Sequence, residues 1–298
     1  MASEPLLDVA EDIDDQIEQF CESRTRLGTE DVLRDIARIV CIANLVQQGV
    51  LDGEQMVLCG GMAMRCLDSP RMSVFDGDTA SVALPDPTTM ADCISYDDDD
   101  IAISAESWKL GEDLMTYMPV TYDARFSALA GAQSEFSLSV AARGIERPAI
   151  RRKLNHRYPF QILREDVEVP IMDPDEILAE KVVAWWLFGH AKHYNDIGFL
   201  TLRMWQAGRL QDPEVKRLVR ALVNKKLEVN RNSSRANIKQ RVAALTEAEK
   251  RHRLEEPGLH VDPKRGFNTL SYLHGDPPTI ESVKASVQKL LVPLLFQN

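Results

Sequence analysis

One stretch decides the fold: residues 56–84, MVLCGGMAMRCLDSPRMSVFDGDTASVAL. Its apolar beginning, 56–59, predicts a short buried strand. Gly60 and Gly61 then predict a tight turn, and 62–67 have the composition of a helix. A strand, a glycine turn and a helix in this order let backbone N–H groups approach a phosphate closely.

An acidic segment, Asp76-Gly77-Asp78, follows in the same stretch, and we expect a second strand after it at 81–84. Two carboxylates at i and i+2 of an extended chain point the same way. Such a pair suits a hard divalent cation such as Mg²⁺, which also bridges nucleotide phosphates in nucleotidyl transfer. A glycine pair or a DxD segment alone is more often a simple turn, so the prediction rests on their combination.

The regions on either side of this stretch predict more of the same α/β unit. Helices are expected at 5–27 and 30–48, the second with Thr29 as its N-cap. Short alternating apolar segments predict three further strands of the same sheet: 101–103, 136–140 and 160–163.

The pattern becomes helical from Asp173 onward. Asp173 is a suitable N-cap, Pro174 fits the first helical position, and Glu176 is placed to complete a capping box. Amphipathic helices follow to the end of the chain. We therefore expect two domains, an α/β core with N-terminal helices over 1–170 and a mostly helical domain over 171–298.

The composition is that of a globular protein. The chain has 298 residues, of which 44% are apolar and 27% charged, and this excludes disorder, collagen and coiled coil as global descriptions. The five cysteines are odd in number and contain no CxxC spacing, which argues against a disulfide framework or a zinc site. Neither a signal-peptide pattern nor a membrane-spanning apolar run is evident, so we expect a cytoplasmic protein.

The net charge of −11 hides an asymmetry along the chain. Residues 1–100 carry 22 acidic and 6 basic side chains, whereas residues 201–253 carry 14 basic and 5 acidic ones. Partners bind faces rather than averages, so the basic segment is a candidate RNA surface. A solvated helix face is an equally weighted alternative.

The basic side chains that could bind RNA phosphates fall into two groups. Those of the later helices are Arg203, Arg209, Lys216, Arg217, Arg220, Lys225, Lys226, Arg231, Arg235, Lys239 and Arg241. Those of the earlier group are Arg151, Arg152, Lys153 and Arg157.

Two charged residues stand out among the predicted helices of the second domain. Residues 175–186, DEILAEKVVAWW, predict a helix on which Lys181 lies in an apolar stripe. A lysine there reaches a buried carboxylate, extends to solvent or contacts the phosphates of a ligand. Asp196, in KHYNDIGFL, is expected to point inward from another packed helix; a helix cap or a pair with Lys192 are the alternatives.

The order and spacing of VLCGGMAMR, FDGD, DPDEILAEKVVAWW and KHYNDIGFL resemble the AbiEii/AbiGii nucleotidyltransferase toxins of type IV toxin–antitoxin pairs. The resemblance covers residues 56–200. It implies a polymerase β-like nucleotidyltransferase core with a mixed sheet, and Mg²⁺-dependent transfer of a nucleotide from an NTP to RNA. The expected acceptor is the tRNA 3′ end, so that translation stops, and a cognate antitoxin is the expected protein partner. The helical domain would complete the active site.

The resemblance also implies roles for particular residues. Those that would bind the nucleotide are Gly60, Gly61, Arg65 and Ser73. Those that would act in catalysis are Asp76 and Asp78, which also bind Mg²⁺, Lys181, which contacts phosphates, and Asp196, which takes the acidic position of the last motif.

The chain departs from the family pattern at several positions. One residue too many separates Ser73 from Asp76, and Lys192 and His193 stand where the family has arginine and aspartate. A polymerase-like triad needs a third carboxylate from a neighbouring strand, where 136–140 offers serines.

Several alternatives stay open. Glu135 and Glu168 are both candidates for the third carboxylate. Asp98 and Asp100 form a second acidic pair that could bind the metal. It ranks below Asp76 and Asp78 because its spacing from Gly60 and Gly61 in the sequence does not fit the family pattern. The chain could also be a catalytically weakened member that binds nucleotide or RNA, or an interaction protein whose acidic N-terminal region binds a partner such as an antitoxin.

Overall fold

The structure, a computed structural model, describes residues 5–24, 27–72, 76–106, 109–110, 115–129, 134–142, 144–154, 158–262, 264, 266–267, 270, 272 and 278–297. The chain divides into two compact units. Unit 1 comprises Met1–Met172 with Ser271–Gly275, and unit 2 comprises Asp173–Leu270 with Asp276–Asn298.

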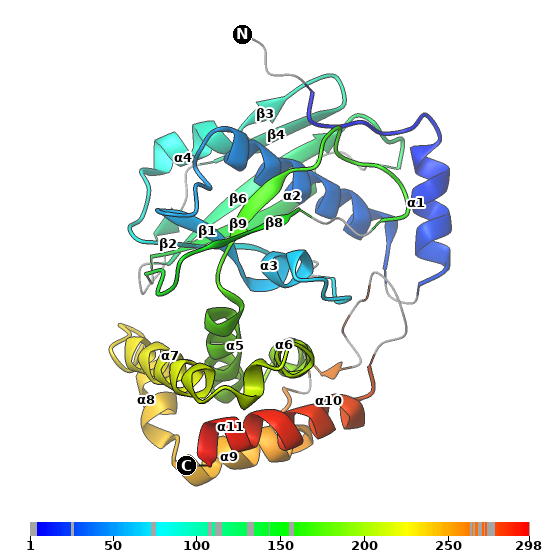
Figure 1. The fold of residues 1–298 in the computed structure, drawn as a ribbon. Helices are drawn as coiled ribbons and strands as arrows, with labels where there is room; N and C mark the ends of the chain where they lie inside the picture. The colour runs from blue at the N-terminus through cyan, green and yellow to red at the C-terminus, as the bar shows by residue number, and fades with distance from the viewer. Residues whose placement is uncertain are drawn as a thin grey trace. The chain divides into compact units, whose positions relative to one another are not determined.

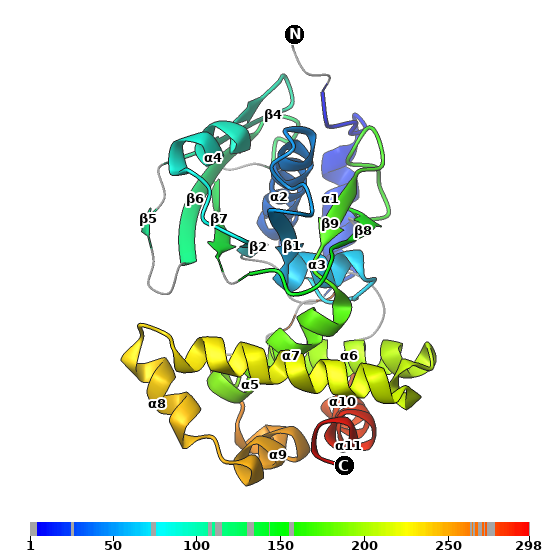
Figure 2. The same cartoon turned by 60° about the vertical axis from the view of Figure 1, so that its left-hand side comes forward.

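Unit 1 is built on one mixed sheet, in which the described residues form nine strands in the order β3-β4-β6-β7-β2-β1-β9-β8, with β5 paired to β6 (Figure 1; β5 and β7 are labelled in Figure 2). The strands are β1 Met56–Cys59, β2 Asp76–Ser81, β3 Tyr96–Asp97, β4 Ile101–Ala105, β5 Lys109–Leu110, β6 Met115–Ala124, β7 Ser134–Ala141, β8 Ile150–Lys153 and β9 Glu168–Ile171. The pairs β2–β7 and β1–β9 are parallel, and the other pairs are antiparallel.

The helices described in unit 1 are α1 Ile13–Glu22, α2 Thr29–Gln47, α3 Gly60–Cys66 and α4 Pro87–Ile94. The long α2 packs against β4, β6 and β7 and contributes buried aliphatic side chains such as Ile36 and Ile39 to the core. Burial of these side chains provides most of the driving force for folding. Thr29 is the first helical residue; the N-cap is Gly28, whose N–H donates to the Asp31 carboxylate at 3.2 Å.

Besides the N-cap of α2, three predicted elements of unit 1 differ from the structure. Residues 5–12 are not helical, and 160–163 do not form a strand; Leu7 and Leu163 instead meet in an isolated antiparallel bridge. The strand expected at 81–84 lies earlier, so that the acidic segment itself begins β2.

Unit 2 is helical in the part of the chain that the structure describes. Its main helices are α5 Pro174–Phe188, α6 Ala191–Gln206, α7 Pro213–Arg231, α8 Ala236–Ala244, α9 Glu247–Glu255, α10 Ile280–Ser286 and α11 Val292–Phe296. Short helical turns lie at η1 Arg209–Gln211, η2 Pro257–Leu259 and η5 Val287–Leu291. Figure 2 shows the long α7 crossing α5, with which it packs.

The predicted start of α5 is confirmed in part. The Asp173 carboxylate accepts the N–H of Asp175 at 2.9 Å, and Pro174 is the first helical residue. The Glu176 carboxylate accepts a hydrogen bond from Lys226 Nζ on α7 at 2.7 Å.

The chain returns to unit 1 after residue 270. There Tyr272 forms an isolated antiparallel bridge with Arg71, which precedes β2. No disulfide bond joins the five cysteines, all of which lie among the described residues. Among the described helices, none is long and apolar enough to cross a membrane.

Candidate active site

Gly60 and Asp78 are brought together by the pairing of β1 with β2. Cys59, the last residue of β1, lies opposite Asp78, and Gly60 follows it with a φ of +62°. A Cβ on Gly60 would lie 2.0 Å from Oδ2 of Asp78 and 2.6 Å from its Cβ. Gly60 is therefore required both by its left-handed backbone and by the carboxylate packed against it.

The second carboxylate oxygen of Asp78 is fixed from β7. Parallel pairing sets Asp78 beside Ser139 and Asp76 beside Ser137, and Ser139 Oγ donates to Asp78 Oδ1 at 2.7 Å. Of Asp76 the structure describes only the backbone, as the first residue of β2. Ser73 lies outside the described residues.

Substituting Gly60 tests the contact with Asp78. We expect Gly60→Ala to lower the nucleotide transfer that the sequence resemblance implies about 100-fold, because the new Cβ displaces the Asp78 carboxylate from its position. Gly49 provides a matched control, since it has a φ of +70° and a Cβ at this position would have no atom within 4 Å. Gly49→Ala should cost the same backbone strain, roughly 1–2 kcal/mol, and leave transfer unchanged. Equal loss in both variants would contradict the steric argument.

The strand register separates the two candidates for a third carboxylate. Glu135 lies on β7 two residues before Ser137, so it shares a strand face with Ser137 and Ser139. Glu168 begins β9 and pairs with Lys153. Because β9 meets β1 only at Ile171, Glu168 is displaced by roughly 10 Å along the strand from that level. Glu135 is therefore nearer in register to the acidic segment.

The second acidic pair stabilises a turn between β3 and β4. Asp98 Oδ1 accepts the N–H groups of Asp100 and Ile101 at 2.9 and 2.8 Å. Its Oδ2 accepts the hydroxyl of Tyr96 at 2.6 Å. The carboxylate of Asp98 therefore has a structural role, because both of its oxygens bind groups of this turn.

Arg65 is buried within unit 1. It lies near the end of α3, fully shielded from solvent, and forms an ion pair with the equally buried Asp35 of α2. Its guanidinium also lies over the ring of Tyr158, 5.4 Å from the centroid. Arg65, which the resemblance places among the nucleotide-binding residues, therefore contacts interior groups of unit 1 in this structure.

In unit 2, Lys181 and Asp196 form a buried ion pair. Lys181 Nζ on α5 lies 2.9 Å from Asp196 Oδ2 on α6, and the two side chains are 8% and 0% exposed. Three outcomes were expected for Lys181, and the structure shows the first of them, a contact with a buried carboxylate. Asp196 points inward, as predicted.

His193 lies one turn before Asp196 on α6. Its Nδ1 is buried and has no hydrogen-bond partner among the described residues. Burial, followed by the positive charge of Lys181, holds the pKa of His193 well below its usual range. The imidazole is therefore neutral beside the ion pair.

Part of the predicted RNA surface is used inside unit 2. Lys226 is buried, and its Nζ donates to Glu176 at 2.7 Å and Glu180 at 3.0 Å. Burial alone would lower the pKa of Lys226, but Glu180 and Glu176 outweigh it and raise that pKa. Arg209 is paired with the buried Asp175 at 2.5 Å.

Two further arginines of this group bind backbone carbonyls. Arg220 donates to Leu294 at 2.5 Å and to Gln297, and Arg241 donates to Leu187 at 2.6 Å. The remaining basic side chains of the group are at least partly exposed: Arg203, Lys216, Arg217, Lys225, Arg231, Arg235 and Lys239. In the earlier basic group Arg151, Arg152 and Lys153 are exposed on β8, and Arg157 lies outside the described residues.

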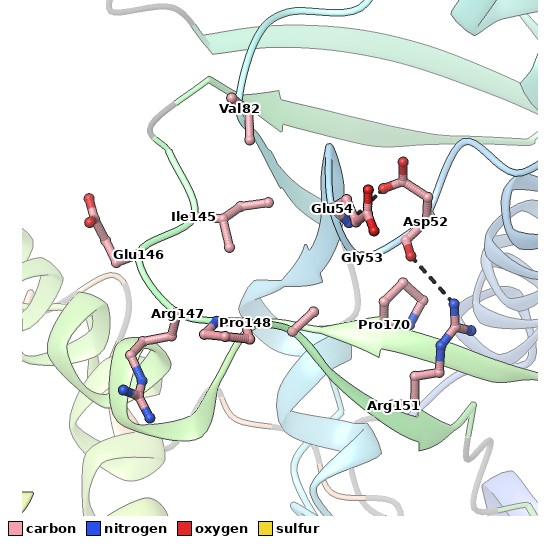
Figure 3. A pocket seen from close by; sticks show the side chains of 11 residues that line it. Asp52, Gly53, Glu54, Val82, Ile145, Glu146, Arg147, Pro148, Arg151 and Pro170 are labelled. Atoms are coloured by element: carbon pink, nitrogen blue, oxygen red, sulfur yellow. Dashed lines mark hydrogen bonds between the residues drawn. The ribbon is translucent and has the colours of Figure 1, made fainter.

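A pocket of about 650 Å³ lies elsewhere on unit 1 (Figure 3). It is lined by Asp52, Gly53, Glu54, Val82, Ile145, Glu146, Arg147, Pro148, Ala149, Arg151 and Pro170. The residues before β1 and after β2 line it, whereas Cys59 and Asp78 pair at the other end of these strands. None of the residues predicted to bind the nucleotide or the metal or to act in catalysis lines this pocket, but Arg151 of the earlier basic group does.

Comparison with known proteins identifies the class. A profile described as nucleotidyl transferase AbiEii toxin, type IV TA system, matches residues 45–270. The match defines a nucleotidyltransferase. The chain belongs to the AbiEii toxin family of type IV toxin–antitoxin systems, as the sequence motifs predicted.

One of the solved structures to which the chain is similar shows the same fold. The mycobacterial nucleotidyltransferase toxin MenT4, Rv2826c from Mycobacterium tuberculosis H37Rv, is 17% identical, with a TM-score of 0.61 over 98% of this chain and 91% of that one. JHP933 from Helicobacter pylori is 15% identical, with a TM-score of 0.46 over 90% and 94%. The chain has no significant match among curated proteins. The match to MenT4 confirms the predicted mixed α/β nucleotidyltransferase fold.

The donor set of the unit 1 site is compatible with Mg²⁺. The described side chains contain no group of three histidine, cysteine or acidic residues arranged to hold a metal. Mg²⁺, however, is commonly held by one or two carboxylates together with substrate phosphates and water. The carboxylate of Asp78, with Oδ1 bound by Ser139, provides a hard oxygen donor of this kind.

Proposed function

We propose that the chain is a Mg²⁺-dependent nucleotidyltransferase that transfers a nucleotide from an NTP to RNA, at the tRNA 3′ end, and so blocks translation. The observation that supports this most directly is the packing of the Asp78 carboxylate on the Gly60 turn, with Ser139 donating to it, in a chain of this family. We further propose a cytoplasmic location and a cognate antitoxin as protein partner.

In the proposed reaction an acceptor hydroxyl of RNA attacks the α-phosphorus, and the bond to the pyrophosphate oxygen breaks. When bound, Mg²⁺ would stabilise the charge that develops on the phosphates. Asp76 and Asp78 are proposed to hold it, and Gly60 and Gly61 to leave room for the triphosphate. Ser139 restricts the rotation of the Asp78 carboxylate, so that its oxygens are oriented before the substrate binds.

Lys181 and Asp196 are proposed to act in the same reaction. A lysine ammonium balances the charge of a pyrophosphate leaving group. Asp196 holds that ammonium at 2.9 Å and so fixes its position.

The exposed basic side chains of unit 2 are proposed to contact the RNA backbone. They are the ones that the structure leaves at least partly exposed, among them Lys216, Arg217 and Lys239. Because binding through phosphates releases counterions, RNA affinity should fall steeply as salt is raised. A salt-insensitive affinity would count against this surface.

The third carboxylate is proposed to be Glu135, and Glu168 supplies a matched control. We expect Glu135→Gln to lower transfer about 100-fold, because one negative charge near the metal is lost. Glu168→Gln should leave transfer unchanged, since Glu168 starts a strand on the other side of β1. Both rates are measured with the same labelled NTP and RNA. The reverse ranking would exchange the two assignments.

The proposed function is tested by incubating the protein with Mg²⁺, each α-labelled NTP in turn, and total tRNA. We expect label to enter tRNA from at least one NTP and to disappear when EDTA removes the metal. Label in other RNA but not tRNA would overturn the proposed acceptor. NTP binding without incorporation would indicate a catalytically weakened member, and absence of NTP binding would leave an interaction protein.

A further inference from the structure

The buried carboxylate of Asp35 is linked, through two arginines, to both elements of the proposed nucleotide site. These elements are α3, which begins at Gly60, and β2, which carries Asp76 and Asp78. Asp35, on α2, is fully buried and accepts hydrogen bonds at both carboxylate oxygens. Arg38 Nη2 donates to Oδ1 at 2.5 Å, and the hydroxyl of Tyr158 donates to Oδ2 at 2.7 Å. Arg65 also donates to Oδ2. One carboxylate thus joins α2 to α3 and to the segment after β8.

One arm of the network ends behind the acidic segment. Gly77 separates Asp76 from Asp78, and a Cβ on Gly77 would lie 3.0 Å from Leu138 Cδ1 and 3.6 Å from Arg38 Cδ. The aliphatic stem of Arg38 therefore packs against the strand directly behind the two aspartates. Its guanidinium is held in this position by Asp35.

The other arm holds α3. Arg65 is in the last turn of this helix, whose first residue is Gly60. The ion pair with Asp35 fixes one end of α3, and the packing of Gly60 on Asp78 fixes the other. Asp35 therefore restrains both partners of the Gly60–Asp78 contact, α3 through Arg65 and β2 through Arg38.

The charge state of Asp35 suits this arrangement. Burial alone would raise the pKa of the Asp35 carboxyl, but Arg65 and Arg38 outweigh it and hold that pKa below its usual value. Burial, together with the negative charge of Asp35, raises the pKa of Tyr158 well above its usual range. The carboxylate stays ionised and the phenol stays protonated, so every hydrogen bond of the network persists at neutral pH.

We infer that Asp35 is a positioning residue for NTP binding, which fixes the glycine turn of α3 relative to the acidic strand β2 without touching the substrate. The inference rests on the proposed function, because it assumes that these two elements bind an NTP. Buried ion pairs contribute little net stability compared with apolar residues of the same shape, whereas they fix geometry in some proteins. A role in positioning therefore predicts an effect on binding beyond any effect on stability.

The test compares Asp35→Asn with Ile42→Ala, a control on the same helix. Ile42 is fully buried two turns beyond Asp35, so its truncation also lowers the melting temperature. All proteins are assayed below the temperature at which circular dichroism detects unfolding. The Kd for a non-hydrolysable NTP analogue with Mg²⁺ is measured by calorimetry, and the KM for RNA is measured in the transfer assay.

We expect Asp35→Asn to raise the Kd for the NTP analogue about tenfold or more and to leave the KM for RNA within twofold. Ile42→Ala should leave both within twofold. Tyr158→Phe removes one hydroxyl and keeps the ion pairs, and it should raise the Kd by a smaller factor. If Asp35→Asn does not fold, Tyr158→Phe provides the measurement, and an unchanged Kd in that variant overturns the inference.

The outcomes also separate this inference from the proposed function. A wild-type Kd in Asp35→Asn, with active wild-type enzyme, overturns the positioning role alone. A raised Kd in Asp35→Asn, in a protein that binds the NTP analogue but transfers nothing, supports the positioning role and overturns the proposed transfer. No binding of the analogue by the wild-type protein overturns both.

Discussion

Replacing Asp78 with asparagine should lower nucleotide transfer about 1,000-fold and leave the fold intact. The amide has the shape of the carboxylate, and its oxygen can still accept the hydrogen bond that Ser139 Oγ gives to Asp78 at 2.7 Å. It lacks the negative charge that a divalent cation requires. Transfer is measured by label incorporation into RNA, and the fold by thermal unfolding.

An exposed aspartate of the same unit provides the control for this variant. Asp92 lies on the exposed side of α4, and Asp92→Asn makes the same chemical change away from β2. We expect it to transfer at the wild-type rate. Activity of Asp78→Asn within a few-fold of wild type would contradict the proposed metal ligand.

Replacing Lys181 with methionine should abolish transfer and destabilise the protein by about 3–5 kcal/mol, because the buried charge of Asp196 loses the ammonium that balances it. Urea unfolding followed by tryptophan fluorescence measures the stability, since Trp185 and Trp186 lie on α5 beside Lys181. Activity is measured by label incorporation, in conditions where the variant is folded.

A double variant separates stability from catalysis at this site. Lys181→Met with Asp196→Asn removes both charges, so much of the stability should return while transfer stays abolished. The control is Lys284→Met, which breaks the ion pair between Lys284 and Glu256, two side chains that are 31% and 48% exposed. This variant should lose less than about 1 kcal/mol of unfolding free energy. Recovery of transfer in the double variant would show that the pair is only structural.

The local parts of the fold could be predicted because neighbouring residues determine them. β1 ends where the glycines begin, and α5 begins at Asp173-Pro174, as the sequence indicated. Cap and turn chemistry acts over a few residues, so a single sequence contains it. The inward position of Asp196 was also predicted from nearby residues, because the residues around it are apolar.

The strands were harder to predict where tertiary pairing overrides local preference. Aspartate and glycine are uncommon in strands, yet Asp76, Gly77 and Asp78 begin β2 because β1 and β7 flank them. The whole of β6 was missed, and Pro119 is one reason. Along one edge of β6, residues from Val120 onward pair with β4, and residues up to Tyr117 pair with β5. Pro119 falls between these two ladders, where a missing N–H is tolerated.

The position of Arg65 could not be predicted for a different reason. Its partners Asp35 and Tyr158 lie far from it in the sequence, and only the folded chain brings them together. The family pattern at this arginine suggests a nucleotide ligand equally well. Burial distinguishes the two roles, and burial is a property of the tertiary structure.

The return of the chain to unit 1 at Tyr272 has a consequence for synthesis of the protein. The partner of Arg71 in the bridge leaves the ribosome only after most of unit 2 has been made. Unit 1, which contains the proposed metal ligands, therefore cannot be completed early in translation. A truncated chain that ends at Met172 lacks this closing segment, so premature termination or early proteolysis should yield a fragment with an incomplete unit 1.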